Sequence, residues 1–448
     1  MIQVAQIIFI LSVLVILHEF GHYFAAKIFK VRVEKFYLFM DAGFSLFKKK
    51  IGETEWGIGW LPLGGYVKLS GMIDESMDTE QLKQEPQPWE FRSKPAWQRL
   101  IIMMGGIFVN IVLAITIYTV MFSTVGQKYI STDVVQKNGL AFGEIGESIG
   151  FKSGDKIVSV DGEPLQKKFN WLTIDVLLSD NIEIDRNGQK INLKLTNKQI
   201  GLLLSKEGRV FMMPRMKETV VDSVFPNSGA LIAGLQKNDK IVAANNRKFN
   251  YYDEFSKIVE ANKNNKISLL VLRNGKEINL TAQVSKEGKL GFLKSSQELK
   301  NNKDFVTVKK MSFFGAIPAA CGESWQLLKY NVKQFKLIFK PETGAYKQVK
   351  SPIGIARMLP DTWDWEFVWG FIALFSIGLA FMNCLPIPGL DGGHALFTIA
   401  EMITGKTLSE KAMANIQTGG MIFLLSLMAL TFGKDIYQWV LDYMATKQ

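Results

Sequence analysis

The chain has 448 residues, 48% of them hydrophobic, and a formal net charge of +11. Its Lys and Arg residues are spread through loops beside apolar segments rather than gathered in a recognition motif, which argues against a nucleic-acid partner and favours an anionic lipid surface. Only two cysteines occur, Cys321 and Cys384, and this number disfavours a disulfide framework.

Four segments lack Asp, Glu, Lys and Arg over roughly the length that crosses the hydrocarbon core of a bilayer. We therefore predict a polytopic α-helical membrane protein with four transmembrane helices. The first segment has no positive n-region and no small-residue cleavage site, which argues against a secretory signal peptide. The four segments are Met1 to His18, Leu100 to Gln127, Phe367 to Leu390 and Ala412 to Gly433.

The loop between the first two spans carries about a dozen Lys and Arg residues, whereas none precedes the first span. By the positive-inside rule this loop is cytoplasmic, and the N-terminus and the central region lie on the other side of the membrane. Within the loop, the stretch from Gly52 to Met72 alternates like strands and breaks at Pro62 and at two glycines. It is too polar to span a bilayer.

The central region, from Lys128 to Glu298, shows alternating strand-like patterns punctuated by Gly and Asn, which predicts a water-soluble, β-rich structure. It also repeats itself. The sequence "GFKSGDKIVSVDG", from Gly150 to Gly162, aligns with "GLQKNDKIVAANN", from Gly234 to Asn246, 84 residues later. Each copy has a glycine turn, a polar loop ending in Asp155 or Asp239, and a strand. Two copies of one small domain are predicted.

The stretch from Val220 to Phe249 in the second copy resembles PDZ domains. Repetition of the same turn and strand in both copies favours this resemblance over an unrelated small β domain. By the resemblance, each copy binds peptide ends or extended segments by adding a strand to a sheet edge.

A basic amphipathic helix is predicted after the repeats, from Ser324 to Lys340. Such a helix either lies on the membrane surface or packs against the protein, and the pattern is compatible with both. The apolar residues at helical spacing are Trp325, Leu328, Val332, Phe335 and Phe339, and the lysines around them are Lys329, Lys333, Lys336 and Lys340.

The first span contains the pattern His-Glu-x-x-His at His18, Glu19 and His22. Two histidines four residues apart project from the same face of an α-helix and can bind one metal ion. Glu19 lies next to the first of them, where a carboxylate can take a proton from metal-bound water. Ionisable groups at membrane depth are costly and need a partner or a function. We therefore predict a site for one Zn²⁺ ion per chain rather than a buried hydrogen-bonded pair.

A catalytic zinc commonly has three protein ligands, so a third is expected at comparable depth. The third span ends in "NCLPIPGLDGGH", from Asn383 to His394, where Pro386 and Pro388 cannot continue a helix. This stretch should unwind, which is tolerated at depth only where backbone is buried in protein or lines a wet cavity. Asp391 is its only acid, and with zinc, two neutral histidines and a hydroxide it gives zero net charge. We predict Asp391 as the third ligand, with His394 as the alternative.

Taken together, these motifs resemble the site-2 proteases. The resemblance rests on His-Glu-Phe-Gly-His in the first span, on a match to the family's Asn-x-x-Pro-x-Pro-x-Leu-Asp-Gly-Gly from Asn383 to Gly393, and on the PDZ-like pair between the second and third spans. It covers nearly the entire chain. Within the family, the bacterial regulator-of-sigma-E type with two PDZ domains is the most similar.

The resemblance implies a zinc-dependent intramembrane metalloprotease. His18, His22 and Asp391 would bind the zinc, and Glu19 would be the general base. Asn383 matches a family position proposed to contact the substrate backbone or stabilise the oxyanion, although a structural amide is an equal alternative.

The stretch from Gly52 to Met72 resembles the family's re-entrant, membrane-associated β-hairpin; the alternative is an ordinary cytoplasmic hairpin. A substrate helix hides its peptide bonds in internal hydrogen bonds and must unwind before cleavage, and a sheet edge can hold the extended form. We expect Gly64, Gly65 and Tyr66 to bind substrate in this way.

By the resemblance, the substrates are single-pass membrane proteins, such as an anti-sigma factor in an envelope stress response, and remnant signal peptides. The protein would be a multi-pass protein of the bacterial inner membrane, with its active site near the cytoplasmic side and its PDZ domains in the periplasm. The alternative is a membrane-anchored PDZ scaffold with a non-catalytic metal site. A metal transporter is disfavoured because the spans offer few acids and no repeated ligand set.

The predicted organisation has ten segments in chain order. They are the first span at 1–30, a cytoplasmic loop at 31–99 with its hairpin at about 51–72, the second span at 100–127, the PDZ-like domains at 128–215 and 216–298, a juxtamembrane amphipathic segment at 299–352, the third span at 353–395, a cytoplasmic loop at 396–411, the fourth span at 412–433 and a tail at 434–448.

Overall fold

The computed structural model describes residues 2–62, 64–72, 85–205, 211–295 and 306–445. The chain forms two compact units. The first, which we call the membrane unit, comprises residues 1–126, 310–335 and 349–448, and the second, the β unit, comprises residues 127–309 and 336–348.

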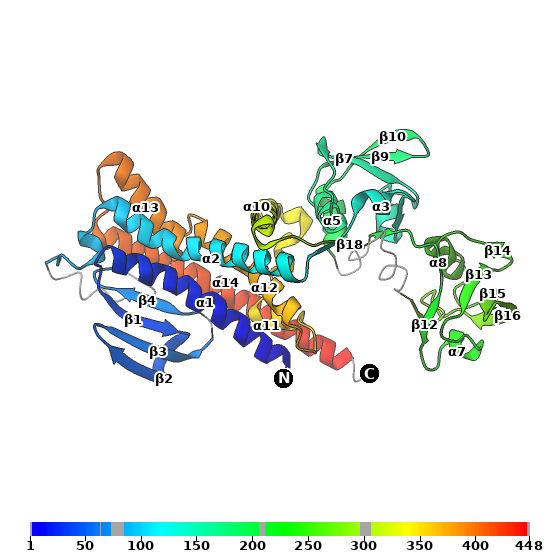
Figure 1. The fold of residues 1–448 in the computed structure, drawn as a ribbon, viewed down its shortest axis with the longest axis horizontal. Helices are drawn as coiled ribbons and strands as arrows, with labels where there is room; N and C mark the ends of the chain where they lie inside the picture. Colours follow the sequence, from blue (N-terminus) through cyan, green and yellow to red (C-terminus); the bar gives the residue numbers. More distant parts are fainter. Residues whose placement is uncertain (1, 63, 73–84, 206–210, 296–305, 446–448) are drawn as a thin grey trace. The chain divides into compact units, whose positions relative to one another are not determined.

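Four helices among the described residues are long and apolar enough to cross a membrane, as predicted. Within the membrane unit, α2 contacts both α1 and α12 along their lengths (Figure 1). The fourth helix extends well beyond the predicted span and includes most of the predicted C-terminal tail, because charged residues end an apolar span without ending a helix. The four are α1 (Ile2–Ile28), α2 (Ala96–Thr124), α12 (Trp365–Cys384) and α14 (Glu410–Ala445).

The chain unwinds after α12, as predicted. Residues 385–390 are not helical, and α13 (Asp391–Thr404) begins directly after them. Pro386 and Pro388 lack a backbone N–H, and Gly389 has a φ of +91°, a conformation that favours glycine. Within the segment predicted as a cytoplasmic loop, 396–411, α13 continues to Thr404 and packs against α2.

A four-stranded sheet follows α1, in the order β2-β3-β1-β4. It corrects the predicted hairpin, because β3 and β4 are not paired with each other. Strand β1 lies between them, parallel to β3 and antiparallel to β4. Pairing in a sheet is not local, so the turn between two strand-like stretches did not reveal the third strand. As a result β4 is an edge strand. The strands are β1 (Val33–Leu38), β2 (Met40–Ile51), β3 (Thr54–Leu61) and β4 (Tyr66–Leu69).

The β unit contains two hydrophobic cores, one for each sequence repeat. The two main sheets have the same strand order, β10-β9-β7-β8 and β16-β15-β13-β14, so the repetition of the sequence is also a repetition of structure. The first repeat consists of β7 (Lys156–Val160), β8 (Glu163–Pro164), α5 (Phe169–Leu177), β9 (Asn181–Arg186) and β10 (Gln189–Lys194); the second of β13 (Lys240–Ala244), β14 (Arg247–Lys248), α8 (Tyr252–Glu260), β15 (Lys266–Arg273) and β16 (Lys276–Gln283).

Shorter elements surround these sheets. The first core also takes up Leu337, from beyond the predicted boundaries of both repeats. The shorter elements of the β unit are β5 (Gln127–Ile130), α3 (Thr132–Gln136), β6 (Leu140–Phe142), α4 (Glu144–Ser148), α6 (Asn197–Leu204), β11 (Met212–Pro214), β12 (Val221–Val224), α7 (Gly229–Ile232), β17 (Phe292–Lys294) and β18 (Val306–Lys309), and the membrane unit adds α11 (Pro352–Ala356).

The predicted amphipathic helix belongs to the longer α10 (Phe313–Ile338). Ala316 and Ala320 of α10 pack with Phe122 of α2, so the helix is partly buried against the membrane unit. The predicted apolar face is only partly covered: Phe335 is half-buried and packs on Phe381 of α12, but other residues of that face are exposed. Trp325 is 59% exposed and Val332 is 40% exposed.

An aspartate and an arginine form the same hydrogen-bonded pair in both repeats. In the first, Arg186 Nε donates to Asp155 Oδ1 over 2.8 Å and Arg186 Nη2 donates to Gly150 O over 2.7 Å. In the second, Arg273 makes the matching bonds to Asp239 Oδ1 and Gly234 O, both over 2.7 Å. The pair ties the glycine turn to the sheet in each copy.

This pair should make the stability of the second repeat depend on pH. Burial by itself raises the pKa of Asp239, but hydrogen bonds from Arg273 and from the Gln236 N–H, with the guanidinium charge, hold that pKa below its usual value. A lowered folded pKa stabilises the fold above the unfolded pKa of about 3.9, and the effect is lost as the pH falls through the folded value.

Asp239→Asn should destabilise the second repeat at neutral pH by about 2 kcal/mol, because a charged hydrogen-bonded pair is lost. Amide hydrogen exchange of β13 and β15 in the full-length protein would measure the loss, which should shrink below about pH 4. Asp222→Asn is a matched control from the same repeat. The Asp222 side chain is 43% exposed, and its Oδ1 lies 3.6 Å from Lys237 Nζ, so the variant removes only an exposed ion pair. An equal loss in both variants would contradict the role of the pair.

Candidate active site

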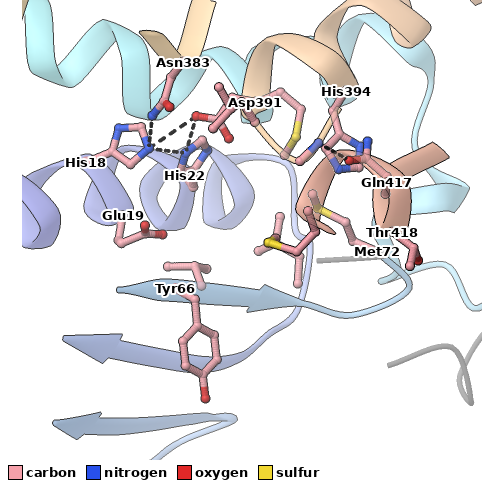
Figure 2. A pocket seen from close by; sticks show the side chains of 16 residues that line it. His18, Glu19, His22, Tyr66, Met72, Asn383, Asp391, His394, Gln417 and Thr418 are labelled. Carbon is pink, nitrogen blue, oxygen red and sulfur yellow. Dashed lines mark hydrogen bonds and ion pairs between the residues drawn. The ribbon is translucent and has the colours of Figure 1, made fainter. Parts of the chain in front are cut away.

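Three ligand-type side chains come together in the membrane unit. His18 and His22 project from α1, and Asp391 is the first residue of α13, so helix periodicity positions the pair and the unwound stretch positions the acid. Asp391 Oδ2 lies 3.3 Å from the Nε2 atom of each histidine, and the two Nε2 atoms lie 3.4 Å apart (Figure 2). The three atoms form a nearly equilateral triangle.

The size of this triangle fits one zinc ion. For ligands at roughly 2.0–2.1 Å in a tetrahedral site, neighbouring ligand atoms are about 3.3–3.4 Å apart. His18 and His22 are 8% and 6% exposed, so a metal ion would be held largely away from bulk water. His394 lines the same cavity but is not part of the triangle. The geometry therefore favours Asp391 over His394 as the third ligand.

Two groups on α2 contact the far sides of the imidazoles. His22 Nδ1 lies 2.9 Å from the Ile102 carbonyl oxygen, so Nδ1 carries the proton and Nε2 presents a lone pair to the triangle. His18 Nδ1 lies 3.1 Å from the side-chain amide of Asn110. Rotating this amide by half a turn would let Asn110 Oδ1, which has no hydrogen-bond partner among the described residues, accept from His18 Nδ1–H. Both Nε2 atoms would then be available to a metal.

Glu19 lies on α1 between the histidines and β4 (Figure 2). The residue just before β4 packs closely against Glu19. A Cβ added to Gly65 would lie 2.6 Å from the Tyr37 carbonyl oxygen and 3.6 Å from Glu19 Cγ. The lack of a side chain at Gly65 thus allows β4 to begin beside the Glu19 carboxylate. Glu19 and the triangle line one cavity of about 100 Å³.

The residues expected to bind substrate are placed differently. Asn383 lines the cavity, and its Nδ2 lies 3.0 Å from His18 Nε2. Tyr66 also lines the cavity, but its ring points away from the histidines and its hydroxyl donates to Asp41 Oδ1 over 3.0 Å (Figure 2). Gly65 packs against α1, and a Cβ on Gly64 would meet nothing within 4 Å. The Asn383 side chain therefore contacts the triangle, whereas the Tyr66 ring does not.

Sequence reasoning missed three polar residues at the site, namely Asn110 of α2 and the neighbouring Gln417 and Thr418 of α14. Gln417 lines the cavity, and Asn110 contacts His18 from behind. All three lie in spans that lack charged residues, and polar side chains at such depth commonly face a protein interior. That signal was available in the sequence.

A glycine on α2 makes room for the two imidazoles. A Cβ on Gly106 would overlap His22 Nε2 and His18 Cε1. Gly106→Ala should therefore displace both rings and weaken zinc binding by roughly tenfold or more, as loss of a supporting contact around a metal site does. Competition with a chelator would measure the change. Gly378→Ala on α12, where a Cβ would meet nothing within 4 Å, should leave zinc affinity unchanged; equal affinity in both variants would contradict the assignment.

Comparisons with known proteins agree with this geometry. The family model described as peptidase family M50 matches residues 6–427. The chain is 31% identical to the regulator of sigma-E protease RseP of Escherichia coli K12, over 97% of this chain and 98% of that protein. It is 29% identical to the corresponding proteases of Salmonella typhimurium and Haemophilus influenzae, over the same shares of both chains.

The triangle of ligand atoms, the glutamate beside it and the family match over nearly the whole length point to one class of enzyme. The chain belongs to peptidase family M50, the site-2 proteases, and is a metalloendopeptidase.

Proposed function

We propose that this protein is a zinc-dependent intramembrane endopeptidase that cleaves the transmembrane segments of single-pass membrane proteins. The observation that carries the proposal is the triangle of His18, His22 and Asp391, with sides of 3.3 to 3.4 Å, on helices of a unit that has four candidate spans. One zinc ion per chain would be held by these three residues.

A zinc ion held by His18, His22 and Asp391 would supply Lewis acidity toward a water molecule and toward the scissile carbonyl group. Glu19 accepts the proton of that water and delivers it to the leaving amine. His22 is held in the required tautomer by the Ile102 carbonyl oxygen. The Asn383 amide, 3.0 Å from His18 Nε2, is close enough to bind the carbonyl oxygen of the substrate as negative charge develops there.

We assign the substrate-holding role to β4. An edge strand has unpaired backbone groups that can bind an extended peptide. Tyr66 and Val67 of β4 line the cavity that contains Glu19, so a peptide added to this edge would pass the proposed base. Gly64 and Gly65 contribute by allowing the strand to start close to α1, and Tyr66 contributes its backbone.

The two repeats are, in this proposal, PDZ-like domains that control which substrates reach the membrane unit. The positive loop between α1 and α2 orients the protein with its active site near the cytoplasmic face and the repeats in the periplasm of a bacterial inner membrane. The names of the relatives in Escherichia coli and Haemophilus influenzae refer to regulation of sigma-E. We therefore include an anti-sigma factor, and remnant signal peptides, among the proposed substrates.

Cleavage by the purified full-length protein, reconstituted in vesicles with a model single-pass substrate, tests the proposal. We expect cuts within the span, identified by mass spectrometry, that are lost on chelation and restored by zinc. Cleavage that persists in metal-free protein would exclude the mechanism. Absence of any cleavage by fully metal-loaded protein, together with peptide binding by the repeats, would instead support a scaffold.

A further inference from the structure

Gln417 is a buried polar residue that the proposed mechanism does not use. It lies on α14, is 6% exposed, and lines the cavity together with Glu19 and Asp391. Its Oε1 accepts a hydrogen bond of 2.6 Å from the backbone N–H of Gly389, in the unwound stretch before Asp391. The fourth span therefore contributes to the cavity wall, and Gln417 links it to the unwound stretch.

The hydrogen bond from Gly389 determines which way the amide points. A backbone N–H can only donate, so the amide oxygen must face Gly389 and the nitrogen must face away from it. Gln417 Nε2 has no hydrogen-bond partner among the described residues. A buried amide donor without an acceptor costs free energy, which a ligand carrying an acceptor oxygen would recover.

Close packing of α14 on the unwound stretch fixes this donor in place. A Cβ on Gly420 would overlap the Pro388 carbonyl oxygen, and one on Gly389 would come within 3.2 Å of the Met421 nitrogen. The helix and the stretch are thus in backbone contact one turn from Gln417. The direction of Nε2 is set relative to the same segment that carries Asp391.

The missing acceptor matches the backbone of an extended peptide. In a strand, successive carbonyl groups point to opposite sides. If one set of carbonyl and N–H groups pairs with β4, the other set faces the remaining walls of the cavity, to which Gln417 contributes from α14 (Figure 2). Donors on those walls are needed, because unwinding leaves these carbonyl groups without their helical partners.

We propose that Gln417 Nε2 donates a hydrogen bond to a backbone carbonyl oxygen of the bound substrate, and thereby orients the peptide against Glu19 and the His18, His22 and Asp391 triangle. This role rests on the proposed function and adds a contact from the fourth span to it. The contact is to the peptide backbone, so it is independent of substrate sequence.

Gln417→Met tests the role, because methionine has nearly the same length and lacks the donor. We expect kcat/KM for a model transmembrane substrate to fall roughly tenfold, the usual effect of losing one hydrogen bond, with zinc content unchanged. Ser426→Ala is the matched control on the same helix, since Ser426 is exposed and, among the residues that the structure describes, bonds only to the Ile422 carbonyl oxygen of its own helix. It should behave as wild type.

Synthetic substrates that carry a single thioamide near, but not at, the scissile bond separate substrate binding from structural support. Sulfur is a weaker acceptor, so one position should cost the wild-type enzyme roughly tenfold and cost Gln417→Met almost nothing. If every thioamide costs both enzymes equally, or if Gln417→Met loses its zinc, Gln417 only supports the Asp391 segment and the proposal is overturned.

A second variant covers the case in which Gln417→Met does not fold. Gln417→Glu keeps an oxygen that can accept from the Gly389 N–H, and it has no donor once its carboxyl group ionises. The thioamide at the same substrate position should therefore stop reducing kcat/KM as the pH rises. A thioamide cost that is independent of pH would count against the proposal. Failure of the proposed function would be recognised separately, as cleavage that survives removal of zinc from wild-type protein.

Discussion

Glu19→Gln is expected to reduce cleavage of a reconstituted transmembrane substrate by roughly 10²- to 10⁴-fold, the usual contribution of a general base, while leaving the zinc content at the wild-type level. The physical reason is positional. Glu19 is outside the triangle of ligand atoms but lines the same cavity and lies beside the edge strand β4. Glutamine has the same shape and cannot accept the proton.

The measurement combines single-turnover cleavage with elemental analysis of the same protein sample. Ser12→Ala is the matched control on α1, because within the described part of the chain Ser12 bonds only to the Ile8 carbonyl oxygen of its own helix. It should retain both zinc and activity. Full activity in Glu19→Gln would refute the general-base role, and loss of zinc from this variant would show that Glu19 is a ligand instead.

Asp391→Asn is expected to weaken zinc binding by more than about 100-fold, which exceeds the usual effect of losing a supporting residue. The neutral amide removes the only negative charge from the triangle and leaves two histidines, which is one ligand fewer than a catalytic zinc site commonly has. Activity should be lost with the metal. Equilibrium dialysis against a zinc buffer of known free concentration would measure the affinity.

His394→Gln is the comparison that decides between the two ligands considered from the sequence. His394 lies three residues after Asp391 on α13 and lines the cavity, but it is outside the triangle. We expect this variant to keep wild-type zinc affinity. If His394→Gln loses zinc and Asp391→Asn keeps it, the ligand assignment is reversed and the loaded site has a different geometry from the one described.

Several features of this protein could be predicted from its sequence because they depend on local periodicity. Spacing of four residues is enough to place His18 and His22 on one helix face, and hydropathy over about 20 residues is enough to identify a span. Pro386 and Pro388 remove backbone donors, so the break after α12 is encoded where it occurs. The internal repeat, with its offset of 84 residues, is detectable by aligning the sequence with itself. In the structure, both copies contain the same hydrogen-bonded Asp–Arg pair.

Other features depend on contacts between distant segments and were decided only by the tertiary structure. Strand β1 inserts between β3 and β4, which makes β4 an edge beside Glu19, and no local pattern specifies that order. From the sequence, charge favours Asp391 over His394 as the third metal ligand. The distances from Asp391 Oδ2 to the Nε2 atoms of the two histidines, which distinguish the two candidates by position, come only from the structure. Gln417 is one of several polar residues in the fourth span, and its bond to Gly389 places it at the site. Periodicity specifies the face of an element, whereas packing specifies what that face meets.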